Sequence, residues 1–186
     1  MMFSIEGFKL RQIEKSDLEK ILNWRNSDRI RANMFSDHII TMEEHLAWYQ
    51  RIKQAQNVRC NIFEYNKEPI GLVNFTEIDR KNSICFWGFY LGESKMLGTG
   101  LIMGYLGLNY AFNIVDIRKV YGQVFAFNLH SVNFFKKLGF MEEGRFRKHV
   151  IKNGVPEDVI FFGLFKEEWN RKKVALEKIV FEDNHS

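Results

Sequence analysis

The alternation of apolar and polar residues predicts a chain built around seven strands. They are expected at residues 8–13, 58–65, 69–78, 83–91, 118–127, 146–151 and 158–165. The first of them (FKLRQI) alternates apolar and charged side chains, the period of a half-buried strand. Runs two to four are separated by short polar turns and predict an antiparallel meander. Asn153-Gly154 joins the last two strands and predicts a tight hairpin, because both residues tolerate positive φ.

A helical period fills most of the remaining chain. Helices are expected at residues 16 to about 26–28, 41–55, 101–113, 129–138 and 166–180. Ser16 and Thr41 occupy N-cap positions, and a glutamate follows each of them three residues later, which predicts two capping boxes. The order of strands and helices predicts one mixed α/β domain over residues 1–186, closed by a C-terminal helix at about 166–180.

Composition narrows the class of protein. The 186 residues are 46% hydrophobic and 27% charged, as in a soluble globular domain. A net charge of +4 is too mild to indicate nucleic acid and is compatible with a small anionic ligand. The N-terminus has no export signal and no apolar run long enough to span a membrane, so we expect a cytoplasmic protein with no membrane partner. Cys60 and Cys85 lie in apolar runs and are expected to be reduced core thiols.

The segment from Phe86 to Leu101 (FWGFYLGESKMLGTGL) carries the chemistry. It predicts a strand that runs into a Gly-X-Gly turn and then directly into a helix. The first backbone N–H groups of a helix have no intrahelical partner and bind phosphate oxygens well. Lys95 adds a cation beside that turn. The spacing matches neither a Walker loop nor GxGxxG, so an ordinary strand-to-helix turn remains an alternative at this point.

Two motifs in this order resemble the GNAT superfamily of acetyl-CoA-dependent N-acetyltransferases. Lys95-x-x-Gly98-x-Gly100 is similar to the family's phosphate-binding motif, and the segment 128–140 (NLHSVNFFKKLGF) is similar to its second motif. The resemblance covers roughly residues 8–165. It implies a mixed central sheet of about seven strands, flanked by helices and splayed between strands four and five. It also implies acetyl-CoA as cosubstrate and no metal; no histidine shows metal-ligand spacing with a second ligand.

The resemblance assigns residues to the cosubstrate. It implies that the pyrophosphate lies on the turn and that the pantetheine arm runs beside Leu91. The residues so assigned are Leu91, Lys95, Leu97, Gly98, Thr99, Gly100, Leu101, Asn128 and Phe134. Asn128 also begins a helix, so an N-cap role stays open.

The catalytic candidates depart from the family pattern. Many GNAT enzymes carry a tyrosine acid where this chain has Phe135, which has no proton to donate. Tyr90 is the candidate acid in its place. The alternative is that Tyr90 is only a core or rim tyrosine with no catalytic role. The candidates for accepting the amine proton are Glu77 and Thr76, near the end of the third strand. The alternative is that Glu77 is a solvated carboxylate at a strand end with no catalytic role.

The N-terminal half resembles a narrower group, the acetyltransferases of pseudaminic acid biosynthesis. The residues that carry this likeness are Arg25, Met34, Phe35, His45 and Trp48. It implies a nucleotide-sugar acceptor, with the arginine on phosphate and the other four forming an apolar wall for uracil. Two alternatives remain: a ribosomal-protein-type N-terminal acetyltransferase and a non-enzymatic CoA-binding sensor. Dimers are common in the family, so a homodimer through the C-terminal helix or an edge strand also stays open.

Overall fold

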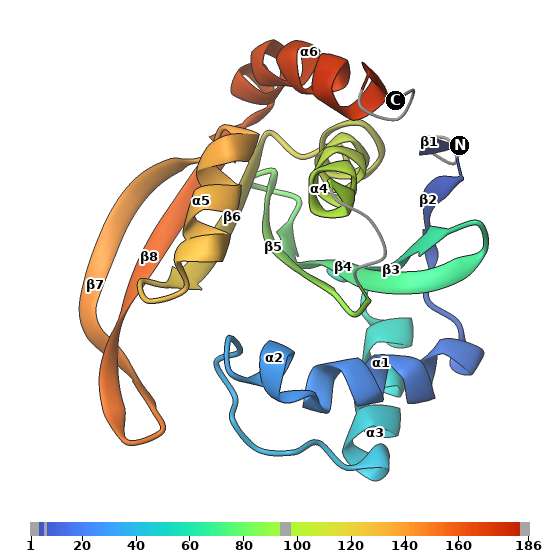
Figure 1. Cartoon of the computed structure of the whole chain (residues 1–186), viewed down its shortest axis with the longest axis vertical. Helices are drawn as coiled ribbons and strands as arrows, with labels where there is room; N and C mark the ends of the chain where they lie inside the picture. The colour runs from blue at the N-terminus through green and yellow to red at the C-terminus, as the bar shows by residue number, and fades with distance from the viewer. Residues whose placement is uncertain (1–3, 6, 94–97, 183–186) are drawn as a thin grey trace.

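The computed structural model describes residues 4–5, 7–93 and 98–182 of the chain (Figure 1). Its centre is an eight-stranded sheet in the order β1-β2-β3-β4-β5-β6-β8-β7. The strands are β1 (Ser4–Ile5), β2 (Phe8–Gln12), β3 (Arg59–Tyr65), β4 (Glu68–Asp79), β5 (Ile84–Leu91), β6 (Lys119–Phe125), β7 (Met141–Lys152) and β8 (Val155–Phe165). The seven expected strands are confirmed, and the two-residue β1 adds one more at the edge.

The sheet divides where β5 and β6 meet. These two strands are parallel, whereas every other neighbouring pair is antiparallel. They pair only from Ile84 to Phe86 on β5, opposite Lys119 to Tyr121 on β6. Beyond Phe86 the ladder ends in the described chain, and the two strands separate in the expected splay. The crossover that parallel strands require is supplied by α4 (Thr99–Tyr110) and the π-helical turn Ala111–Val115.

Helices cover both faces of the sheet (Figure 1). On one face lie α1 (Leu18–Asn26), α2 (Asp28–Arg31) and α3 (Met42–Gln54), and on the other lie α4, α5 (Leu129–Leu138) and α6 (Lys166–Glu182). Adjacent residues of β3 show this division, because Ile62 packs with the first group and Phe63 with the second. The C-terminal helix packs on its own chain through the buried Trp169, whose Nε1 donates to Asn109 Oδ1 at 3.1 Å.

Three local expectations need correction. The Thr41–Glu44 capping box is confirmed, with Thr41 N donating to Glu44 Oε2 at 2.7 Å, but the one expected at Ser16 is wrong. The first turn is instead a 3-10 helix capped by Glu14, whose N–H donates to Asp17 Oδ2 at 2.8 Å.

The other two corrections concern an additional helix and the length of one strand. The sequence did not predict α2, a single helical turn that follows α1. Strand β7 begins at Met141, well before residue 146, because an exposed edge strand carries charged residues without breaking its pairing.

Candidate active site

A cavity of about 1060 Å³ lies in the splay and joins both faces of the sheet. On the α4 side it is lined by Gly100, Met103 and Phe134. On the opposite side Arg25 of α1 and Trp48 of α3 contribute to the same lining. A cavity with this reach can hold two substrates at once, each entering from its own face.

At the α4 end, the glycine at the helix start has the expected turn geometry. Gly98 adopts a left-handed φ of 84° and is the N-cap of α4, a conformation that only glycine takes without strain. The amides of Leu101 and Ile102 donate to the Gly98 carbonyl oxygen at 2.8 and 3.2 Å, so both are engaged within the turn. The expectations for Lys95 and Leu97 fall outside the described residues.

The walls beside this turn suit a long, narrow cosubstrate. A Cβ built on Gly100 would lie 3.7 Å from Leu91 Cδ1 and 3.8 Å from Phe134 Cε2, so these two side chains flank the turn. The backbone edge of β5 beyond Phe86 has lost its strand partner and is available to a linear arm. Asn128 lines the cavity and also caps α5, since its Oδ1 accepts from Ser131 N at 3.1 Å. The described residues therefore fit the diphosphate and pantetheine of CoA.

Phe135 is fixed in the core. Its ring stacks on Phe162 at 5.1 Å and meets Phe140 edge-on at 4.7 Å. A Cβ on Gly122 would lie 2.7 Å from the Phe135 ring, so the β6 backbone holds that ring closely. The position provides packing and no acid.

Tyr90, the candidate acid, lines the cavity and packs against the α1–α3 cluster. Burial raises the pKa of its phenol above the ordinary value, and the nearby Arg25 only partly opposes this. A phenol of this kind keeps its proton at neutral pH and can donate a hydrogen bond.

The structure places Glu77 and Thr76 outside the cavity lining, at the closed end of the splay. A bulge between Thr76 and Asp79 gives Glu77 a left-handed φ of 52°. Its carboxylate accepts a hydrogen bond from Tyr121 at 2.6 Å. Any proton that reaches Glu77 from the cavity must therefore pass through Tyr121 or through water.

The five residues expected to bind the acceptor do gather in the cavity, and we call them the acceptor wall: Arg25, Met34, Phe35, His45 and Trp48. The His45 and Trp48 rings stack on each other at 4.9 Å with an interplanar angle of 16°. A base cannot enter between rings in contact, so it can only stack on the outside of this pair.

The acceptor wall presents unsatisfied polar atoms. Arg25 Nη1 and His45 Nε2 are buried and have no hydrogen-bond partner among the described residues. Burial lowers the pKa of both groups, and for His45 a hydrogen bond with the Leu18 backbone partly opposes it. The other terminal nitrogen of Arg25 donates to Ser36 Oγ at 2.6 Å, so the guanidinium is held in place. A ligand with polar groups can form hydrogen bonds with both atoms.

Sequence reasoning missed other polar groups of the lining. Arg29 Nη2 donates to the carbonyl oxygens of Leu91 and Gly92, both at 2.8 Å, and so ties α2 to the end of β5. Arg51 and Glu44 also line the cavity, and Glu44 is the one Asp or Glu among its described lining residues. Contacts between side chains and distant carbonyls leave no periodic signal, so no pattern in the chain pointed to Arg29.

Both cysteines are buried and free, and burial raises the pKa of each thiol to about 12. Among residues 4–5, 7–93 and 98–182, no group of three His, Cys, Asp or Glu side chains is placed to hold a metal ion. No helix in the same residues is long and apolar enough to cross a membrane.

A splayed parallel strand pair followed by a glycine turn and a helix has the geometry to hold CoA. A family model described as "Acetyltransferase (GNAT) domain" matches residues 10–161. The chain belongs to the GNAT acetyltransferase family, and it is an N-acetyltransferase that uses acetyl-CoA.

Three relatives show the range of this family. The prophage-derived uncharacterized N-acetyltransferase YokL of Bacillus subtilis is 29% identical over 170 residues, covering 88% of this chain and 93% of its own. The spermidine N(1)-acetyltransferase of Vibrio cholerae is 28% identical over 152 residues, covering 81% of this chain and 88% of its own. A crystal structure of spermidine N-acetyltransferase from Vibrio cholerae with CoA and spermine superposes with a TM-score of 0.84. That match has 24% identity and covers 89% of this chain and 99% of the other. Acetyltransferase PseH of Campylobacter jejuni is 25% identical, covering 75% and 85%.

Proposed function

We propose that the chain acetylates the 4-amino group of UDP-4-amino-4,6-dideoxy-N-acetyl-β-L-altrosamine, a step of pseudaminic acid biosynthesis. The observation that carries this proposal is the unsatisfied guanidinium nitrogen of Arg25, which lines the same cavity as the stacked rings of His45 and Trp48. A diphosphate supplies the anion that a buried arginine requires, and uracil supplies a flat ring. The relative PseH, at 25% identity, gives the subfamily resemblance distant support.

Charge argues against a polyamine acceptor. The Vibrio cholerae relative is a spermidine acetyltransferase, and spermidine is a polycation at neutral pH. In this chain the described lining carries Arg25, Arg29 and Arg51 against the single carboxylate of Glu44. Like charges brought together in a partly buried site are repelled, which selects against such a ligand. The same reasoning disfavours the basic N-terminus of a ribosomal protein.

The reaction assigned to this site is direct transfer. Acetyl-CoA supplies a thioester, the neutral amine attacks its carbonyl carbon, the C–N bond forms and the C–S bond breaks. A backbone amide of β5 polarises the carbonyl oxygen. Tyr90 donates a hydrogen bond to the departing sulfur, and the amine proton leaves to water, with Glu77 as acceptor through a relay. The chain belongs to a family of acetyltransferases, which favours an enzyme over a non-enzymatic CoA-binding sensor.

The test is CoA release from acetyl-CoA with four mixtures: the nucleotide-sugar, spermidine, a ribosomal N-terminal peptide and no acceptor. We expect turnover with the nucleotide-sugar alone. Turnover only with spermidine or the peptide would refute the proposed acceptor and leave the acetyltransferase activity in place.

A variant separates the acceptor wall from the cosubstrate site. Arg25→Met should raise the KM for the nucleotide-sugar by about 10- to 100-fold, as expected for a hydrogen bond to a charged group, and leave the KM for acetyl-CoA within about twofold. Arg171→Met, an exposed arginine on α6, is the matched control. Equal changes in both KM values would show that Arg25 does not act on the acceptor.

A further inference from the structure

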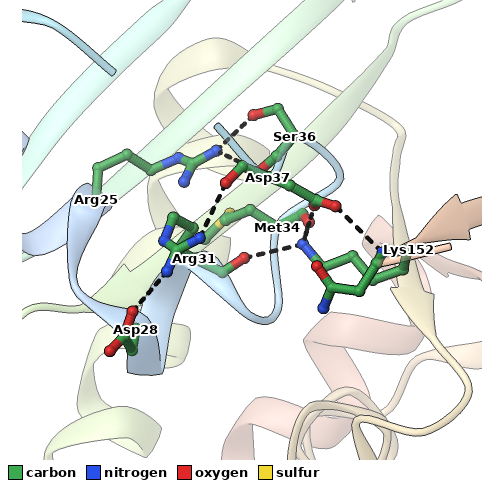
Figure 2. Close-up of polar contacts among 8 residues, drawn as sticks. Arg25, Asp28, Arg31, Met34, Ser36, Asp37 and Lys152 are labelled. Atoms are coloured by element: carbon green, nitrogen blue, oxygen red, sulfur yellow. Dashed lines mark hydrogen bonds and ion pairs between the residues drawn. The ribbon is translucent and has the colours of Figure 1, made fainter. Parts of the chain in front are cut away.

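The tip of the β7–β8 hairpin contacts the loop that carries part of the acceptor wall. We call residues 32–40, between α2 and α3, the acceptor loop. Lys152 is the last residue of β7, and its Nζ donates to the carbonyl oxygens of Met34 at 2.7 Å and Arg31 at 3.1 Å (Figure 2). The same ammonium forms an ion pair with Asp37. Asn153 N adds a contact of 3.4 Å to the other carboxylate oxygen of Asp37.

From these contacts we propose that Lys152 is a positioning residue for acceptor binding, which holds the acceptor loop where Met34 and Phe35 line the cavity. Lys152 does not itself line the cavity, so it acts through the loop. The inference deepens the proposed function, because it concerns the same acceptor wall, but it holds for any amine that binds there.

The burial of Lys152 argues for a dedicated contact. Its side chain is 5% exposed, rare for a lysine, and its ammonium donates to three oxygens, which uses all of its protons. The ion pair also holds the pKa of the Asp37 carboxyl below its usual value, chiefly through the hydrogen bond from Lys152. The turn that follows is tight, with left-handed φ values of 50° at Asn153 and 80° at Gly154.

The acceptor loop depends on such side-chain contacts because it forms no regular helix or strand. Asn26 holds its far end by exchanging hydrogen bonds of 2.8 and 2.9 Å with the Ile40 backbone. Arg25 holds its middle at Ser36. Lys152 reaches the loop from β7, the edge strand of the sheet, and it donates to the carbonyl oxygen of Met34, a residue that lines the cavity.

A shift of the loop would therefore change the acceptor wall in two ways. Phe35, 41% exposed, packs on Phe125 with ring centroids 4.7 Å apart, so its place depends on the backbone beside it. Arg25 would lose its Ser36 partner and with it the aim of its unpaired nitrogen. Neither change touches the glycine turn at the start of α4.

The experiment measures loop exchange and kinetics on Lys152→Met, with Arg147→Met on the same strand as the matched exposed control. We expect faster amide hydrogen exchange confined to residues 31–40 and an acceptor KM raised about tenfold. The acetyl-CoA KM should stay within twofold. Asp37→Asn, which keeps the side-chain shape and leaves Lys152 intact, should give a smaller change of the same kind if Lys152→Met fails to fold.

The outcomes separate the two proposals. Faster exchange with an unchanged acceptor KM, or an unchanged exchange rate, would overturn the positioning role. A rise in both KM values together would also overturn it, because a general loss of structure moves both. If wild-type protein turns over spermidine and not the nucleotide-sugar, the proposed function fails, and the same kinetic comparison with spermidine as acceptor still decides the role of Lys152.

Discussion

Two glycines of α4 lie almost one helical turn apart and should respond in opposite ways to the same substitution. A Cβ at Gly104 would lie 2.8 and 2.9 Å from the Leu138 methyls and 3.0 Å from Phe134 Cζ. At Gly107 the nearest atoms would be Val73 Cγ1 at 3.4 Å and Trp87 Nε1 at 3.5 Å, ordinary contact distances. Alanine is therefore accommodated at Gly107 and overpacked at Gly104.

The magnitudes decide the signs. Replacing glycine by alanine inside a helix stabilises it by about 1 kcal/mol. At Gly107 little opposes this gain. At Gly104 overpacking costs about 1–3 kcal/mol, and Leu138, 0% exposed, has no open space to move into. We expect Gly107→Ala to raise the free energy of unfolding and Gly104→Ala to lower it, with the two variants about 2 kcal/mol apart.

Thermal unfolding at one pH and one concentration measures this difference. For a chain of this size, 2 kcal/mol corresponds to a separation in Tm of roughly 4–8 °C. Urea titration checks that the slope of unfolding is the same in both variants. A Gly104→Ala protein as stable as Gly107→Ala would refute the reasoning, because it would show that α4 and α5 move apart at little cost.

Three further predictions concern the site. Tyr90→Phe should lower kcat about 100-fold, the low end for general acids, with both KM values little changed; an unaffected kcat would make Tyr90 a rim residue. Burial lowers the pKa of His45, so the unfolded state takes up its proton first as pH falls below about 6.5. Wild type should therefore lose more Tm than His45→Gln between about pH 7.5 and about pH 5.5, and equal losses would contradict this. Gly98→Ala should cost about 1 kcal/mol in stability through its left-handed φ and raise the acetyl-CoA KM with the acceptor KM unchanged, as steady-state kinetics would show.

The strands were predictable because their signal is local. Alternation located β2 to β6 and β8 within a few residues, and the Asn153-Gly154 turn was identified from residue type alone. Strand β7 was predicted too short, because an edge strand exposes charged side chains and loses the apolar half of the pattern. The capping box at Ser16 failed because Arg11 pairs with Asp17 at 2.7 Å, which favours a start at Glu14.

The site was predictable where chemistry follows a motif and unpredictable where it follows packing. The glycine turn, Leu91 and Phe134 lie together as the motifs implied. Arg29 meets the β5 carbonyls across 62 positions, and Lys152 meets Met34 across 118. A polar contact at such separation adds no periodicity to either segment. The position of Glu77 was also hidden, since a bulge in β4 redirects it toward Tyr121.

The cosubstrate half and the acceptor half of the cavity are built from different parts of the chain. For this reason a shared fold does not identify the acceptor. The cosubstrate half is built mainly from backbone: a splayed strand pair and a helix N-terminus. The acceptor half is built from side chains of α1, α3 and the acceptor loop. A close superposition on a spermidine enzyme therefore shows a shared fold and does not identify the amine. The acetyl transfer follows from the family match over residues 10–161. In this chain arginines outnumber carboxylates along the described lining, and the anionic acceptor we propose rests on that excess rather than on the shape of the sheet.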